Sequence, residues 1–201
     1  MYKYKLIKNL SFVMIAFVAL VFPAKTFSWP REGSPEISQG KYFSITLDKG
    51  IDAVYVAEKL NYDYLLHPES ALDLTATTHD SILAKTLDSL YLEVSDILDL
   101  HSYNYHGSIH FVKDQAAVRK IFAKYFGKEF SERSFFLQEE NIIFISSEDL
   151  TLGMLGHEIA HAIICHYFVA PPPTKTQEVL AGYVEYSLRK KAGSLPVIIN
   201  Q

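Results

Sequence analysis

The sequence predicts an α+β fold, in which helices pack on a small, mostly antiparallel sheet. Short runs rich in aromatic and β-branched residues predict strands, because such side chains suit a pleated surface. Longer runs with apolar residues every three or four positions predict helices with one buried face. At 201 residues, 49% of them hydrophobic, the chain has enough apolar material for one domain, with or without a short appendage.

The first strand and the first two helices follow a polar lead-in. Residues 29–40 contain Pro and Gly and are interpreted as a flexible lead-in to a domain that covers residues 41–201. Tyr42–Leu47 has the alternating pattern of a strand. Ile51–Leu66 has apolar residues at helical spacing and is followed by a proline that ends the pattern. His79–Leu100 is the clearest amphipathic helix of the chain.

The middle of the chain predicts three more strands and a short helix. Ser108–Lys113 is expected to be a strand, and Asp114–Phe126 a helix that Gly127 closes. Phe135–Leu137 and Asn141–Ser146 flank a polar stretch, which suggests a hairpin. The second arm of that hairpin leads directly into the next helix.

Two helices separated by three consecutive prolines are expected at the C-terminal end. The first is Leu150–Phe168, whose start Ser146 and Asp149 can cap. The second is Thr174–Lys191, where the first residue and Gln177 have the spacing of a capping box.

The Leu150–Phe168 helix contains the motif HExxH. Residues four apart on a helix lie on the same face, so His157 and His161 can bind one metal ion together. Glu158 lies beside the first histidine and can act as a general base toward a water bound to that metal. The motif is short, so its structural context must support it.

A catalytic zinc ion usually has three protein ligands and one open position. Glu178 is the preferred third ligand, because the nine residues Val169–Gln177 span up to about 30 Å and can bring the last helix back to the motif. Two alternatives remain open. Glu185 lies seven residues further on the same helical face, and Cys165 lies one turn after His161.

With these residues in place, the segment His157–Tyr186, HEIAHAIICHYFVAPPPTKTQEVLAGYVEY, resembles the peptidase MA-like gluzincins, a family of zinc metallopeptidases. In that family HExxHA is followed by a linker with Pro and a helix that reads EGLAEY. Glu178–Tyr183 reads EVLAGY, so the chain departs at Val179 and at Gly182. The resemblance implies a zincin-like fold, with the HExxH motif on an active-site helix and a glutamate on the following helix.

The resemblance also implies a function. A gluzincin is a hydrolase that cleaves peptide bonds with a water activated by Zn²⁺, and Glu158 would be its general base. His157, His161 and Glu178 would be the metal ligands. The expected partner is a peptide or protein substrate.

Further site residues follow only from the resemblance. In zincins the strand before the metal-binding helix pairs with the substrate backbone, so the expected docking edge contains Asn141, Ile143 and Ile145. Tyr183 and Tyr186 are candidates for stabilising an oxyanion, and placement of these tyrosines in the core is the alternative.

Two other functions remain open at this point. A zincin-like domain can bind zinc and serve as a non-catalytic interaction or assembly module in the cell envelope, although Glu158 favours catalysis. Hydrolysis of a non-protein amide, such as a peptide link of a cell wall, is not distinguished from proteolysis by composition.

The N-terminal residues predict export. Met1–Lys8 carries three lysines and no acidic residue, and Asn9–Ala24 is an uncharged, mostly apolar run of 16 residues. That length is typical of a signal peptide and short for a membrane-spanning helix. We expect residues 1–28 to be a signal peptide cleaved after Ser28, with an uncleaved membrane anchor as the alternative. The rest of the protein is then periplasmic or secreted.

Charge and cysteine content exclude some partners. Residues 1–28 contain four lysines and no acidic residue, so their removal changes the formal net charge from -4 to -8. An acidic protein is a poor ligand for nucleic acid or an anionic membrane, so membrane contact is expected only through an uncleaved N-terminal segment. Cys165 is the only cysteine, which excludes an intramolecular disulfide. Composition does not indicate an oligomeric state.

Overall fold

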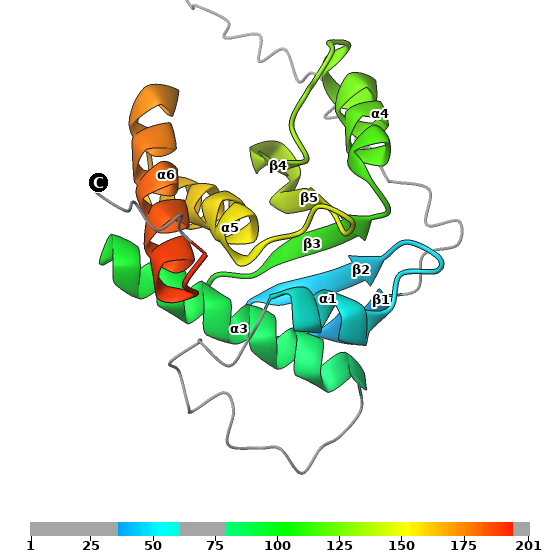
Figure 1. The fold of residues 1–201 in the computed structure, drawn as a ribbon. Helices are drawn as coiled ribbons and strands as arrows, with labels where there is room; N and C mark the ends of the chain where they lie inside the picture. The colour runs from blue at the N-terminus through cyan, green and yellow to red at the C-terminus, as the bar shows by residue number, and fades with distance from the viewer. Residues whose placement is uncertain (1–35, 61–78, 195–201) are drawn as a thin grey trace, which may run out of the picture. The chain divides into compact units, whose positions relative to one another are not determined.

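The computed structural model describes residues 36–60 and 79–194, which contain a five-stranded mixed sheet and five α-helices (Figure 1). This arrangement confirms the predicted α+β class. The expected signal peptide of residues 1–28 and residues 61–66 of the helix expected at Ile51–Leu66 lie outside the described residues. Within the described ranges, no helix is both long and apolar enough to cross a membrane.

The sheet has the strand order β1-β2-β3-β5-β4. Its strands are β1 (Glu36–Gln39), β2 (Phe43–Leu47), β3 (Gly107–Val112), β4 (Ser134–Leu137) and β5 (Ile142–Ser146). The pairs β2–β3 and β3–β5 are parallel, whereas β1–β2 and β4–β5 are antiparallel. The sheet is therefore mixed, and the prediction of a mostly antiparallel sheet was wrong. The helical connection from β2 to β3 returns the chain to the same end of the sheet, which parallel neighbours require. After β3 and a further helix, the reversed strand β4 brings the chain back, so that β5 runs parallel to β3.

The lead-in contains a strand that the sequence did not predict. Glu36–Gln39 forms β1, which pairs with β2 through backbone hydrogen bonds that composition does not reveal. The backbone N–H of Gly40 donates to the carbonyl of Phe43 at 2.8 Å and closes the turn between the two strands. Asp88 holds the same turn, since its carboxylate accepts from the backbone N–H groups of the two residues that follow Gly40.

The five helices begin close to the predicted positions, and all except the first, which ends at Lys59, also end close to them. They are α1 (Ala53–Lys59), α3 (His79–Leu98), α4 (Gln115–Phe126), α5 (Leu152–Tyr167) and α6 (Thr174–Lys191). Asp114 caps α4 through its side chain, and Gly127 ends this helix with φ 63°, a left-handed conformation that glycine adopts without strain.

The caps of α5 and α6 differ from the prediction. Thr151 caps α5 by accepting from the backbone N–H of Met154, while Ser146 and Asp149 hydrogen-bond to each other in the preceding turn. The predicted capping box at the start of α6 is absent, because no side chain caps this helix and Gln177 bonds elsewhere.

The two faces of the sheet pack against different helices. Ile143 and Ile145 of β5 point into the main core, which α1, α3, α5 and α6 complete. Phe144 points to the opposite face, where its ring centroid lies 5.1 Å from that of Phe135. The ring centroid of Phe135 lies 5.2 Å from that of Phe122 in α4. This alternation is expected for a strand buried on both faces.

The α5–α6 pair positions the candidate site. α6 lies against α5 and also contacts α3 (Figure 1), where Lys191 forms an ion pair with the buried Glu93. A Cβ added at Gly156 would lie 2.1 Å from Cδ1 of Leu188. The glycine therefore allows a side chain of α6 to pack directly on the backbone of α5. The start of α5 contacts the end of α6, and His161 further along α5 contacts Glu178 near the start of α6, so the two helices run in opposite directions.

Candidate metal centre

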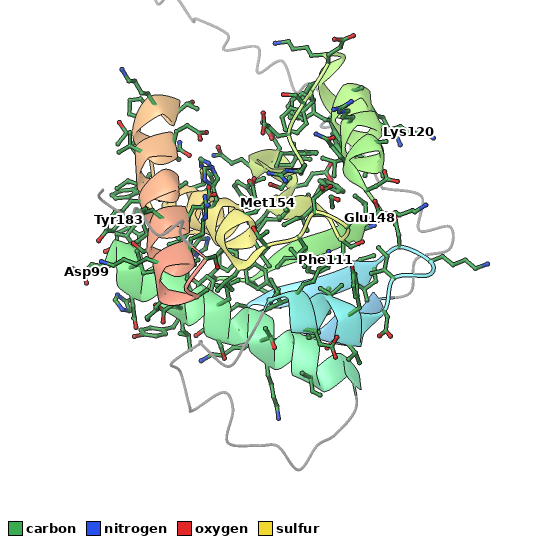
Figure 2. The ribbon with its side chains drawn as sticks, viewed as in Figure 1. Asp99, Phe111, Lys120, Glu148, Met154 and Tyr183 are labelled. Carbon is green, nitrogen blue, oxygen red and sulfur yellow. The ribbon has the colours of Figure 1, made fainter. Side chains whose placement is uncertain are left out.

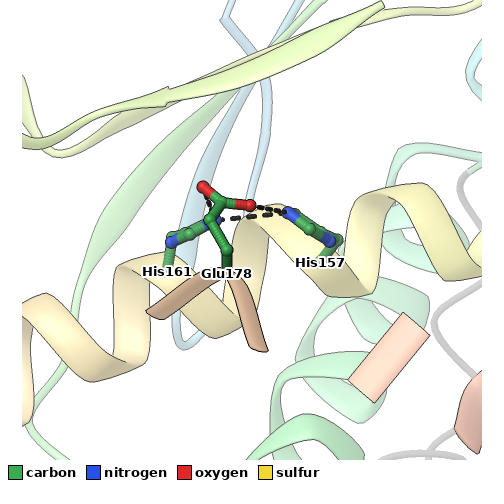
Figure 3. A group of neighbouring side chains, drawn as sticks. All are labelled: His157, His161 and Glu178. Atoms are coloured by element: carbon green, nitrogen blue, oxygen red, sulfur yellow. Dashed lines mark hydrogen bonds and ion pairs between the residues drawn. The ribbon is translucent and has the colours of Figure 1, made fainter. Parts of the chain in front are cut away.

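His157, His161 and Glu178 converge on one point between α5 and α6, as Figure 3 shows. The Nε2 atoms of the two imidazoles are 3.2 Å apart. The carboxylate of Glu178 lies 3.4 Å from each of them, with Oε2 toward His157 and Oε1 toward His161. The spacing of the motif on α5 and the return of α6 thus bring together the three residues that the sequence predicts as ligands.

These distances fit a tetrahedral zinc site. Ligand atoms about 2.0–2.1 Å from a tetrahedral zinc ion are about 3.3–3.4 Å from one another. The two Nε2 atoms are separated by 3.2 Å, and each lies 3.4 Å from its own oxygen of the Glu178 carboxylate, so the separations are close to this value. The two nitrogens and one carboxylate are also the donor set of many catalytic zinc sites.

The surroundings of His161 favour its neutral form. Burial lowers its pKa below the ordinary value, and the neighbouring His157 lowers the pKa further. The nearby Glu178 carboxylate and the Gln177 side chain act in the opposite direction. An imidazole must be neutral at the ligating nitrogen, so this environment favours metal binding near neutral pH.

The other ring nitrogens face oxygen atoms of α6. Nδ1 of His161 lies 3.4 Å from Oε1 of Gln177, whose amide donates to the carbonyl of Pro172 at 2.8 Å. Nδ1 of His157 is buried and makes no regular hydrogen bond, but Oε2 of Glu185 lies 3.5 Å from it. Partners of this kind commonly orient metal-binding histidines.

Glu158 is buried next to the three candidate ligands. Its Oε1 accepts a hydrogen bond of 2.7 Å from Oγ of Ser134, and the backbone N–H of Phe136 also donates to it. Burial raises the pKa of Glu158 to about 7, although these two donors oppose the shift. The negative charges of Glu178 and Glu132 raise the pKa further. A carboxyl group with this pKa can take up and release a proton near neutral pH.

All four residues line one cavity of about 360 Å³. One wall is β4 with the loop before it, including Phe130, Glu132 and Ser134, and the other wall is formed by α5 and α6. The cavity is therefore the place where a substrate could reach the candidate metal site.

The predicted docking edge on β5 was wrong. β5 lies inside the sheet between β3 and β4, so its backbone groups are already paired. Ile143 and Ile145 are fully buried in the core, and the side-chain amide of Asn141 donates to the carbonyl of His106. β4 is the edge strand instead, because the hairpin places the first arm outside the second.

The two tyrosines predicted as oxyanion candidates lie away from the cavity. Tyr183 is 58% exposed and Tyr186 52% exposed, and neither lines the cavity. Figure 2 shows Tyr183 on the outer side of α6. Their position on the surface also differs from the alternative of a place in the core.

The two alternative ligands lie outside the group of converging atoms. Glu185 faces Nδ1 of His157, while Nε2 of that ring faces Glu178. Cys165 lines the cavity, with its Sγ 3.5 Å from Oε1 of Gln177. Glu178 is therefore the carboxylate that completes the candidate site.

Two residues of the site were missed by sequence reasoning. Ser134 contacts Glu158 from 24 positions earlier in the chain, and nothing in its local sequence indicates this contact. Gln177 was considered only for helix capping. Its position immediately before Glu178 was a usable signal, because a ligand on one helix brings its neighbours close to the other ligands.

Comparisons of the chain with protein family models, curated proteins and solved structures found no match. The functional argument therefore rests on the chemistry of the site itself.

Proposed function

We propose that this protein is a zinc-dependent metallopeptidase of the gluzincin type, with a zincin-like fold. The observation that carries the proposal is the convergence of His157, His161 and Glu178, with each histidine Nε2 3.4 Å from a Glu178 oxygen, in a cavity that also contains the buried carboxyl group of Glu158. A purely structural metal site has no need for an additional acid of this kind, and structural zinc sites usually have four protein ligands.

The residues have separate tasks in this proposal. His157, His161 and Glu178 hold the zinc ion. When bound, zinc supplies a water of lowered pKa and polarises the carbonyl of the substrate. Glu158 accepts the proton of the attacking water and donates it to the leaving amine, for which a pKa near neutrality is suitable. Ser134 holds the Glu158 carboxyl group in place through its hydroxyl.

We propose the outer edge of β4 as the docking strand for an extended substrate. β4 lines the cavity and is the last strand of the sheet on this side. An extended peptide can add to such an edge through backbone hydrogen bonds. This pairing would place the substrate backbone beside the candidate zinc site. The enzyme is exported if residues 1–28 are a signal peptide.

The first experiment measures the zinc content of the purified protein and of the variants His161→Ala and Glu178→Ala. We expect about one zinc per chain in the parent protein and a large loss in both variants, because each variant removes one of three ligands. A parent protein that binds no zinc when zinc is supplied would contradict the proposal.

The second experiment tests catalysis with a library of peptides. We expect the zinc-loaded parent to cleave peptide bonds and Glu158→Gln to retain zinc but lose hydrolysis, by about 10²-fold or more. Zinc binding without hydrolysis of any peptide would instead favour the non-catalytic assembly module. Cleavage of cell-wall peptides alone would assign the activity to that substrate class.

A further inference from the structure

The Nδ1 atom of His157 is a buried polar atom that lacks a regular hydrogen bond. The nearest carboxylate is Glu185, with Oε2 at 3.5 Å, and it comes from α6. We propose that Glu185 is a positioning residue of the metal site: its carboxylate accepts the Nδ1–H of His157 and fixes the ring with Nε2 toward the metal. This inference rests on the proposed zinc site.

The position of Glu185 on the other side of the ring separates this role from that of a ligand. Nε2 of His157 faces Glu178 at 3.4 Å, and Nδ1 faces Glu185. Two nitrogens of one imidazole point in different directions, so both carboxylates cannot bind the same ion. A proton on Nδ1 leaves the lone pair on Nε2 free for the metal.

The packing of α5 and α6 holds Glu185 in this place. Gly153 lies under its side chain, and a Cβ at that position would be 3.1 Å from Cγ of Glu185 and 2.8 Å from Cγ of Arg189. Arg189 also lies one turn further on α6, with its guanidinium 3.6 Å from Oε1 of Glu185. Oε1 therefore faces the arginine, which leaves Oε2 for His157.

His161 has a different outer partner, which provides an internal comparison. Its Nδ1 faces the neutral amide oxygen of Gln177, whereas His157 faces a carboxylate. A charged acceptor makes a stronger hydrogen bond and increases the basicity of the ligating nitrogen. We therefore expect Glu185 to contribute more to zinc affinity than Gln177 does.

The test measures the zinc affinity of the full-length protein by competition with a chromophoric chelator. The variants are Glu185→Ala, which removes the acceptor, and Glu185→Gln, which keeps an acceptor oxygen but loses the charge. Glu148→Gln is the matched control, since it removes the same charge from an exposed site before α5. The thermal unfolding of each zinc-free protein reports whether the fold is intact.

We expect Glu185→Ala to bind zinc about 10- to 100-fold more weakly than the parent, still at about one zinc per chain. Glu185→Gln should recover part of this loss, because its amide oxygen can orient the ring as Gln177 does for His161. If the uncharged glutamine restores part of the zinc affinity, residue 185 acts by orienting the His157 ring and not only through its charge. The control should bind zinc as the parent does.

Three results would overturn the inference. Parental zinc affinity in Glu185→Ala would exclude a positioning role and leave the proposed function standing. Equal losses in Glu185→Gln and Glu185→Ala would show that only the charge matters. Absence of zinc binding in the parent would remove the proposed function and this inference together. If Glu185→Ala does not fold, Glu185→Gln decides, since an unchanged affinity would contradict a role of the carboxylate.

Discussion

Glu158 is the residue whose environment has the clearest consequence for stability. Burial raises its pKa from the ordinary 4.5 to about 7 in the folded, zinc-free protein. Between these values the folded state binds a proton that the unfolded state has already lost, so stability decreases as the pH rises from 4.5 to 7. Over this range the contribution of Glu158 to the free energy of unfolding falls by about 3 kcal/mol. The fall ends above the pKa that Glu158 has in the folded protein.

This residue-scale prediction is tested by denaturant unfolding of the zinc-free parent and of Glu158→Gln at pH 5 and pH 7.5. The variant cannot ionise, so it lacks this contribution, and we expect the parent to lose more stability than the variant between the two pH values. Identical pH dependence in the two proteins would refute the prediction. The comparison cancels the contributions of other titrating groups.

At the same scale, the sequence predicted which side chains converge at the candidate site better than it predicted the residues that contact them. The pair His157 and His161 is local, because helical geometry alone brings residues four apart together. Glu178 could be predicted as a neighbour of these histidines because the linker is long enough to bring its helix back to them. Ser134 could not be predicted from the sequence, because its contact with Glu158 depends on β4 lying at the edge of the sheet beside α5.

At the scale of elements, Gly156 explains how closely α6 approaches α5. An added Cβ would lie 2.1 Å from Cδ1 of Leu188, which is fully buried and has little room to move. We expect Gly156→Ala to lower the free energy of unfolding by about 1–3 kcal/mol, because overpacking outweighs the better helix propensity of alanine. Thermal or denaturant unfolding measures this change.

Gly182 is the matched control on α6. A Cβ at this position meets no atom within 4 Å, so Gly182→Ala should gain helix propensity without a clash. The expected effect is a stabilisation of up to about 1 kcal/mol. If both alanine variants were stabilised, the α5–α6 contact would be looser than the structure indicates.

The elements themselves were largely predictable, and their order in the sheet was not. Hydrophobic periodicity is local, and it identified four of the strands and all five described helices within a few residues, apart from the end of the first helix at Lys59. Strand order depends on crossovers between distant parts of the chain. For this reason β5, a correctly predicted strand, was assigned the edge position that β4 occupies.

At the scale of the whole molecule, the candidate site joins two parts of the C-terminal region. α5 also contacts α3 and β4, whereas α6 contacts α5 and α3. The linker between α5 and α6 contains three prolines, which favour an extended backbone. The relative position of the two helices is therefore set by their packing and by the contacts at the candidate site. The sequence indicated this arrangement through the length of the linker and the position of Glu178 on the second helix.

Zinc should therefore stabilise the entire fold. A ligand that binds only the folded state adds about 4 kcal/mol at a free concentration 1,000-fold above its dissociation constant. For a protein of this size we expect the thermal midpoint to rise by roughly 10 °C with zinc and to return after a chelator is added. Glu178→Ala, which lacks the ligand from α6, should show a much smaller rise. A midpoint that zinc does not change in the parent would mean that α5 and α6 are not joined through a metal, and the three residues would then be an ion-pair cluster between two packed helices.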